Sequence, residues 1–337
     1  MGKATGVTRR RFVWSAAAGM LIAATGPMRI ARAQAKFKLR YYSWVPKTSV
    51  FAEGMAEFVK AIEAKTNGEV TLEWGGSAEA TGPFQAADAI TNGIYDAGHL
   101  ANSLYASSMP EATCLSAGTA PAAKLRATGA LDAYADVMKK RNGLVFLGMP
   151  ASGPGYTFLT RTPINSLADM KGRKIRSLPL YDPLIRALGG SPTTIAPAEV
   201  FTALENGVVD GLGWSDFGII EFRFNEKTNF RLTPTFYGAR TAFVVGPQAW
   251  ARLPGPIQKA LTDATKDAEL AVEKHYLGRH AEEQKKLGEL GMKTTALSAA
   301  EGKTLKETAN QVMWDKIVKD SAQNGPRLKE AFDKAEA

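Results

Sequence analysis

The sequence is poor in the residues that bind metals and form catalytic sites. Its 337 residues include one cysteine, Cys114, and three histidines, His99, His275 and His280. A single cysteine excludes an internal disulfide and a zinc site built from cysteines. It does not argue against a location outside the cytoplasm, where disulfides are permitted but not required. His275 and His280 are five residues apart, which does not place two ligands on one helical face, so the sequence predicts no metal site.

Motifs that bind phosphates or activate a nucleophile are also missing. The sequence has no P-loop, and its glycine pairs lack the spacing of a dinucleotide-binding loop. Residues 213–218 place Ser215 in a stretch like a nucleophile elbow, but one residue too many separates the serine from the second glycine. No pair of carboxylates stands at two predicted strand ends. We therefore predict no enzyme activity, no catalytic residue and no cofactor, with an exported hydrolase acting through Ser215 as the alternative.

The positive charge of the chain is concentrated at its beginning. The formal net charge is +9, but residues 1–33 carry six lysines and arginines and no acidic residue, which leaves +3 for the rest. A net charge this small on a chain of this length does not indicate nucleic-acid binding. Hydrophobic residues make up 45% of the chain and charged residues 22%, as in soluble globular proteins. The length favours two domains.

Residues 1–33 have the pattern of an export signal. A twin-arginine pattern at residues 8–13 is followed by an apolar stretch at 13–25 and by small residues at 31–33. A membrane anchor is the alternative, but the apolar stretch is shorter than the ~20 residues that a spanning helix needs. We therefore expect a twin-arginine signal peptide that is removed before Gln34, and a mature protein in the periplasm.

The order of predicted strands and helices indicates two α/β lobes and a helical region. Residues 34–150 alternate strand and helix, which favours a parallel sheet, and residues 151–245 form the second lobe. Residues 246–337 are mainly helical and contain a long helix at 256–290. The predicted strands are 37–43, 70–74, 94–99 and 144–149 in the first lobe, 156–159, 174–176 and 208–212 in the second, 231–236 and 242–246 between the lobes, and 293–297 near the end.

Arg176 and Trp214 stand at the ends of two predicted strands. Arg176 closes the short strand 174–176, because the prolines that follow prevent its continuation. Trp214 comes just after the apolar run 208–212, which is too short for a helix and which we interpret as a buried strand. Open α/β sheets bind ligands at strand ends. The guanidinium of an arginine offers paired donors that match a carboxylate.

Two motifs in this part of the chain carry a resemblance to a known family. They are Asp-Met-Lys-Gly-Arg-Lys-Ile-Arg at Asp169–Arg176 and Glu-Val-Phe-Thr-Ala-Leu-Glu-Asn-Gly-Val-Val-Asp-Gly at Glu199–Gly211. In this order and at this spacing, they resemble the periplasmic solute receptors of TRAP transporters, and the resemblance extends from about residue 37 to residue 253. It implies an α/β fold of two lobes, like the type II periplasmic binding proteins, with strands that cross between the lobes and a long bracing helix.

The resemblance also implies roles for individual residues. In the family, the arginine at the position of Arg176 holds the carboxylate of the ligand, whereas the sequence alone would favour a surface ion pair with Asp169 or Asp182. Receptors for 2-oxo acids tend to have Glu-Trp, with a metal-binding glutamate, where this chain has Gly213-Trp214. Sialic-acid receptors have a second arginine where this chain has Tyr156. We therefore expect neither a bound cation nor a sugar acid.

The other candidate residues for binding are mainly aromatic. One charged anchor with apolar walls selects a monocarboxylate with an apolar or aromatic body. For each aromatic residue taken singly, packing in the core is the alternative. Arg240 precedes a predicted strand and could contact an anion, although a surface ion pair is favoured. The predicted ligand-binding residues are Arg176, Trp214, Tyr156, Phe217, Trp44, Asn102 and Tyr181, with Phe158 as a further candidate.

The predicted function is that of a monomeric receptor without enzyme activity. It binds a small organic acid in a cleft between the lobes, closes around it, and delivers it to the membrane subunits of a TRAP permease, which the resemblance implies as partner. Three alternatives remain open: a receptor of the same fold for a C4-dicarboxylate or a 2-oxo acid, a ligand-sensing partner of a membrane kinase, and the exported hydrolase.

Overall fold

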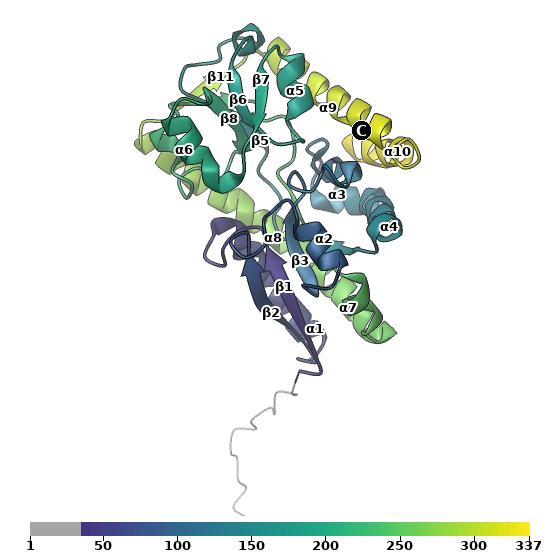
Figure 1. Ribbon diagram of the computed structural model, residues 1–337. Helices are drawn as coiled ribbons and strands as arrows, with labels where there is room; N and C mark the ends of the chain where they lie inside the picture. Colours follow the sequence, from purple (N-terminus) through teal and green to yellow (C-terminus); the bar gives the residue numbers. More distant parts are fainter. Residues whose placement is uncertain (1–34) are drawn as a thin grey trace, which may run out of the picture. The chain divides into compact units, whose positions relative to one another are not determined.

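Two β-sheets organise the part of the chain that the computed structural model describes, residues 35–337 (Figure 1). The predicted signal peptide, residues 1–33, and the predicted cleavage point before Gln34 lie outside the described residues. Among the helices of the described part, none is long and apolar enough to cross a membrane.

The first sheet is mixed. In the described residues its strand order is β2-β1-β3-β10-β4, where β1 is parallel to β2 and β3, and β10 is antiparallel to β3 and β4. The predicted parallel arrangement of the first three strands, β1, β2 and β3, is therefore confirmed. The sheet is mixed because β10 returns from the second sheet and enters between β3 and β4 in the opposite direction. The strands are β1 Phe37–Ser43, β2 Val70–Ser77, β3 Ala97–Ala101, β4 Val145–Gly148 and β10 Thr241–Val245.

The second sheet has the order β11-β9-β5-β8-β6-β7. Strand β8 lies between β5, to which it is antiparallel, and β6, to which it is parallel. β10 lies among the residues assigned to the second lobe but pairs in the first sheet, so the predicted crossing of strands between two α/β lobes is confirmed. The strands are β5 Tyr156–Thr160, β6 Lys174–Ser177, β7 Ser191–Thr194, β8 Gly211–Ser215, β9 Phe230–Thr233 and β11 Lys293–Ala296.

Strand β8 begins later than the sequence predicted. Helix α6 ends at Glu205, and Gly207 follows it with a φ of +69°. The N–H of Val208 then donates to the carbonyl of Ala203, which is the pattern of a helix C-cap with a left-handed glycine. Val208 is consequently half exposed rather than part of a buried strand. The observed strand β8, Gly211–Ser215, contains Trp214, whereas the predicted strand ends before this residue.

The helices cover the sheets and connect them. Helix α8 packs against α1 and β4 of the first sheet region, while α9 packs against α5 and α10 packs against α4 (Figure 1). The predicted long helix and the final helical region are therefore present. The helices are α1 Glu53–Lys65, α2 Ala86–Thr91, α3 Ala122–Ala127, α4 Ala130–Asn142, α5 Asp182–Ala187, α6 Val200–Glu205, α7 Pro247–Ala251, α8 Gly255–Glu289, α9 Ala299–Asp320 and α10 Gly325–Glu336.

Two acidic side chains of α8 bind elements of both sheets. The carboxylate of Glu269 accepts two hydrogen bonds from Arg126 of α3, each 2.8 Å long, and one from the N–H of Met149 (2.9 Å), which follows β4. Six residues before the end of the helix, the carboxylate of Glu283 accepts hydrogen bonds from the N–H groups of Gly218 (2.7 Å) and Ile220 (2.9 Å), which follow β8. Burial raises the pKa of both carboxyl groups, although these hydrogen bonds oppose the shift. Helix α8 thus braces both sheets.

His99 lies inside the first sheet. Its Nδ1 is 3.1 Å from the hydroxyl of Ser43 on β1, and its Nε2 is 3.0 Å from the hydroxyl of Thr241 on β10. Burial lowers the pKa of His99 to about 3, because the interior disfavours the charged imidazolium. The ring is therefore neutral in the folded protein under all but strongly acidic conditions.

We predict that His99 makes the protein less stable in acid. In the unfolded chain this side chain has its ordinary pKa of 6.5, so between pH 6.5 and about 3 the unfolded state binds a proton that the folded state does not. Stability therefore falls as the pH falls through this window, with a slope of up to about 1.4 kcal/mol per pH unit from this residue. Denaturant unfolding from pH 7 to pH 4 should show a flatter pH dependence for His99→Gln than for the unchanged protein. Equal slopes would contradict the prediction.

Candidate functional site

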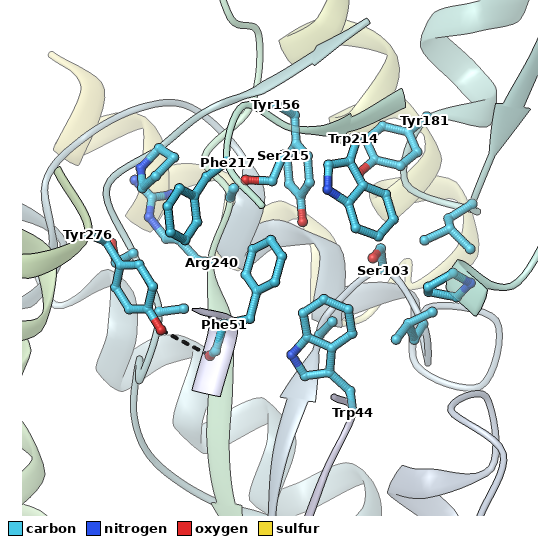
Figure 2. A pocket seen from close by; sticks show the side chains of 18 residues that line it. Trp44, Phe51, Ser103, Tyr156, Tyr181, Trp214, Ser215, Phe217, Arg240 and Tyr276 are labelled. Carbon is cyan, nitrogen blue, oxygen red and sulfur yellow. Dashed lines mark hydrogen bonds between the residues drawn. The ribbon is translucent and has the colours of Figure 1, made fainter. Parts of the chain in front are cut away.

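A cavity between the two sheets forms the candidate binding site. It encloses about 530 Å³, including the part of its mouth that is open to solvent. Figure 2 shows side chains that line it, contributed by both sheets and by α8. The lining residues are Trp44, Phe51, Ala101, Ser103, Leu104, Ala151, Ser152, Pro154, Tyr156, Leu178, Tyr181, Pro197, Trp214, Ser215, Phe217, Ala239, Arg240 and Tyr276.

Aromatic rings from the two sheets meet across this cavity. Trp44 follows β1, and Phe51 belongs to the short 3-10 helix Val50–Ala52. The ring centroid of Phe51 is 5.1 Å from that of Trp44, 6.4 Å from that of Trp214 and 5.6 Å from that of Phe217. Contacts at these distances stabilise aromatic pairs. Phe51 therefore closes one side of the cavity by joining the two halves of its wall.

Tyr156 and Tyr181 form the wall on the side of the second sheet. Their ring centroids are 5.2 Å apart in an edge-to-face arrangement. In Figure 2 the hydroxyl of Tyr156 points towards Phe51, Trp44 and Ser103. Burial raises the pKa of Tyr156 to about 12, although hydrogen bonds from Tyr181 and Ser103 oppose the shift. The Tyr156 hydroxyl is therefore protonated at neutral pH.

Arg176 is fully buried immediately behind these aromatic residues. Its Cζ atom lies 5.2 Å from the ring centroid of Trp214, as expected from the parallel pairing of β6 with β8. Its Nε donates to the carbonyl of Ile195 (2.9 Å) and its Nη1 to the carbonyl of Gly213 (3.1 Å). No acidic residue of the described chain forms an ion pair with it, so the favoured alternative from sequence alone, a surface pair with Asp169 or Asp182, is wrong. Burial lowers the pKa of Arg176 to about 10.

Several polar atoms of the site are buried without a hydrogen-bond partner among residues 35–337. They include Nη2 of Arg176, the indole nitrogens of Trp44 and Trp214, and the hydroxyl of Ser215. Most buried polar groups of proteins have a partner, so each exception needs an explanation. Three of these four groups can only donate a hydrogen bond. Their gathering at one cavity is explained if a bound molecule supplies acceptor atoms.

Gly213 leaves room for Tyr181. A side-chain carbon at position 213 would lie 3.0–3.2 Å from ring atoms of Tyr181, so a glutamate could not stand there unless that ring moved. The described residues contain no group of three or more His, Cys, Asp or Glu side chains that could hold a metal ion. The lining residues themselves include no acid. The donor set of the cavity therefore fits an anion better than a cation.

The structure brings most of the predicted binding residues together. Trp44, Tyr156, Tyr181, Trp214 and Phe217 all line the cavity, and Arg176 lies behind them rather than on the wall.

Two of the candidates lie elsewhere. Asn102 is buried outside the lining, where its amide donates to the carbonyl of Arg240 (3.0 Å) and its carbonyl accepts from Tyr105. Phe158 packs on Phe236 in the core, with ring centroids 4.8 Å apart.

Arg240 is not in the surface ion pair that the sequence favoured. Its side chain is 3% exposed and lines the cavity. Its Nη1 donates to the carbonyl of Leu115 (2.9 Å), and its Nη2 donates to the carbonyl of Ala120. The prediction was wrong because the backbone of these two residues, and not an acidic side chain, occupies the guanidinium.

Sequence reasoning missed Phe51, Ser103 and Tyr276 as parts of the wall. Ser103 follows the predicted Asn102 by one residue, so the end of β3 was a sufficient signal for it. Phe51 and Tyr276 belong to helices, and their periodic apolar positions look the same whether they face a core or a cavity. Ser215 was considered only as a nucleophile. Its hydroxyl has no partner among the described residues, so none of their side chains activates it as a base would.

Comparisons with known proteins identify the family. The family model "Bacterial extracellular solute-binding protein, family 7" (DctP) matches residues 42–320. A solute-binding protein of Roseobacter denitrificans is 34% identical over 121 residues, which are 35% of this chain and 37% of that protein. A monocarboxylate 2-oxoacid-binding periplasmic protein of Nostoc is 24% identical over 88% of this chain and 82% of its own.

A solved structure supports the fold. The TRAP periplasmic solute binding protein of Desulfovibrio salexigens, with bound orotic acid, superposes with a TM-score of 0.80 at 21% identity. The match covers 89% of this chain and 99% of that one. Because the family model matches most of the sequence, the chain belongs to the DctP family of bacterial extracellular solute-binding proteins.

Proposed function

We propose that the protein is the solute receptor of a TRAP transporter and binds a small organic acid in the cavity between the two sheets. The observation that carries this proposal is Arg176, a buried guanidinium with a free Nη2 and no acidic partner among the described residues. A buried charge without a partner is costly, and a carboxylate ligand would remove that cost. The Nostoc relative is named as binding 2-oxo acids and the Desulfovibrio relative as holding orotic acid, which supports this ligand class.

The apolar walls favour a monocarboxylate with an apolar or aromatic body. Rings of Trp44, Phe51, Trp214 and Phe217 would cover such a body, and Arg176 would hold its carboxylate. Nη2 and the second N–H of Nη1 are free to bind both carboxylate oxygens, since only one N–H of Nη1 is used by Gly213. We propose Arg176, Trp214, Tyr156, Phe217, Trp44 and Tyr181 as the ligand-binding residues. Asn102 would act indirectly, by holding the backbone of Arg240.

Two lobes would close around the ligand and stabilise it. We propose that the lobe boundaries follow the sheets, with α8 and the last two helices as braces. The free energy of closure must come from contacts made only in the closed state. We propose that the contacts of Phe51 with Trp214 and Phe217, which join the two sides of the cavity, are such contacts. The closed form would be recognised by the membrane subunits of a TRAP permease.

We further propose that the protein acts in the periplasm after export through the twin-arginine pattern at residues 8–13. It would act as a monomer, without enzyme activity and without a resident cofactor. The lack of a base beside Ser215 within the described chain favours this reading over an exported hydrolase. A sensing role with a membrane kinase and a dicarboxylate or 2-oxo acid as ligand remain the alternatives.

A thermal-shift screen tests the proposed function. We expect at least one small carboxylic acid to stabilise the protein, whereas the neutral amide of the same acid does not, because Arg176 recognises the negative charge. A ligand present at about 100 times its Kd adds about 2.7 kcal/mol to the unfolding free energy. The panel should contain aliphatic, aromatic, 2-oxo and sugar acids and dicarboxylates. Equal shifts with acids and amides, or no shift with any acid, would contradict the proposal.

A further inference from the structure

We propose that Arg240 is a second recognition group of the cavity, which selects organic acids that carry an uncharged oxygen acceptor besides the carboxylate. The inference rests on the proposed function, because it assigns the second polar group of the same ligand. It concerns a residue just before β10, on the first sheet, whereas Arg176 belongs to the second sheet.

The guanidinium of Arg240 is buried and held in one orientation. It donates to the carbonyls of Leu115 and Ala120, and it lies against Gly238, where a side-chain carbon would be 2.7 Å from Cζ. Its remaining N–H groups have no partner in the described part of the chain, and its side chain lines the cavity. A donor that is fixed in advance in this way loses little entropy when it binds an acceptor.

Burial lowers the pKa of Arg240 overall, but two carboxylates, Glu336 and Glu273, stabilise its charge and act to raise this pKa, whereas no carboxylate does this for Arg176. Both carboxylates bind segment 120–122, which also binds Arg240. The carbonyl of Ala120 accepts a hydrogen bond from Arg240, and the N–H of Ala120 donates to the carboxylate of Glu336 (2.7 Å). Two residues further, the N–H of Ala122 donates to Glu273 (3.3 Å). Glu273 and Arg240 also line a neighbouring cavity together.

This difference between the two arginines determines which ligand charge the site prefers. Arg176 leaves one uncompensated positive charge at the site, whereas Glu273 and Glu336 offset the charge of Arg240 from behind the wall. A monoanion therefore neutralises the site, and a second carboxylate at Arg240 would meet the field of two acids. A neutral carbonyl oxygen accepts from the free N–H groups of Arg240 without that repulsion.

Other polar groups that line the same cavity favour an acceptor as well. The indole N–H groups of Trp44 and Trp214 are unpaired among the described residues and can only donate. The hydroxyl of Tyr156 is close enough to Arg176 and to Arg240 that both guanidinium groups act to lower its pKa, although burial raises it overall. Tyr156 and Arg240 line the same cavity, so a ligand held by both arginines would also lie near this hydroxyl.

The test compares matched acids that differ in one carbonyl oxygen. Titration calorimetry with the full chain should use pentanoate against 4-oxopentanoate, hexanoate against 5-oxohexanoate, and glutarate. We expect each oxo acid to bind about tenfold or more tightly than its parent acid, since a hydrogen bond to a charged donor is lost in the parent. In Arg240→Gln and Arg240→Lys this preference should fall severalfold, while the affinity for hexanoate changes little. Glutarate should bind more weakly than either oxo acid.

Arg173→Gln is the matched control. Arg173 also donates to backbone carbonyls, those of Thr162, Pro163 and Asp169, but it does not line the cavity. Its replacement should leave the oxo preference unchanged. If Arg240→Gln is poorly folded, Arg240→Lys, which keeps the charge, decides the question.

The results separate this inference from the proposed function. Acids that bind through Arg176 without any oxo preference would overturn the inference alone, as would a loss of affinity in the Arg240 variants that is equal for oxo and parent acids. Tightest binding of glutarate would show that the second group is charged and would also overturn it. If no carboxylate binds the unchanged protein, both fail.

Discussion

Replacing Arg176 by glutamine is expected to weaken the binding of the organic acid about 100-fold or more, because a buried carboxylate then loses its charged partner. The stability of the ligand-free protein should change much less. Removing the buried charge relieves its desolvation, whereas losing one of its hydrogen bonds to Ile195 and Gly213 costs free energy. These effects oppose each other, so the unfolding free energy should stay within about 1 kcal/mol of the original value.

Calorimetric titration and denaturant unfolding of the same preparations check both halves of this prediction. Arg173→Gln serves as control, since it removes an arginine that binds backbone carbonyls away from the cavity. Its affinity for the acid should be unchanged. A purely structural Arg176 would give the opposite pattern, with a large loss of stability and an affinity that is retained in the folded fraction.

Replacing Gly54 by alanine is expected to destabilise the protein by about 3 kcal/mol. Gly54 lies on α1, where a side-chain carbon would be 1.8 Å from the carbonyl oxygen of Pro150 and 3.1 Å from the ring of Tyr276. Neither the backbone at Pro150 nor the ring of Tyr276 can move away easily. Pro150 follows β4, and Tyr276 is a cavity residue of α8 whose hydroxyl accepts from the N–H of Gly54. The substitution therefore forces α1 away from both β4 and α8.

The same substitution at Gly278 provides the control. Gly278 also lies in a helix, α8, but a side-chain carbon there would have no neighbour within 4 Å. Gly278→Ala should stabilise the protein by about 0.5–1 kcal/mol, because alanine is the better helix former. Unfolding in denaturant measures both variants. A Gly54→Ala protein as stable as the original would mean that α1 does not pack on β4 as described.

The sequence was most informative where a site depends on neighbouring strands. Arg176 and Trp214 could be placed together from their motifs, because two parallel strands bring their ends to one edge of a sheet. The structure has these residues 5.2 Å apart, from Cζ to ring centroid. The exact bounds were less predictable: Val208 has the composition of a strand residue, but its N–H caps α6. Hydrophobicity alone cannot distinguish a residue of a buried strand from a residue that caps a helix.

The environment of Arg240 could not be predicted from its local sequence. Whether an arginine is buried depends on which distant groups satisfy it, and here these are the carbonyls of Leu115 and Ala120, about 120 residues earlier in the chain. The same reason explains why the place of β10 between β3 and β4 was not predicted, because β10 pairs there with strands from much earlier in the chain. Long-range pairing of this kind leaves no local signal.

A crystal structure of the complex with the tightest acid of the screen tests the central claim most directly. We expect the carboxylate oxygens within about 3 Å of Nη1 and Nη2 of Arg176, with the body of the acid between Trp44, Phe51 and Trp214. An acid bound elsewhere, or one bound in this cavity with its carboxylate away from Arg176 and Nη2 still unpaired, would contradict the account.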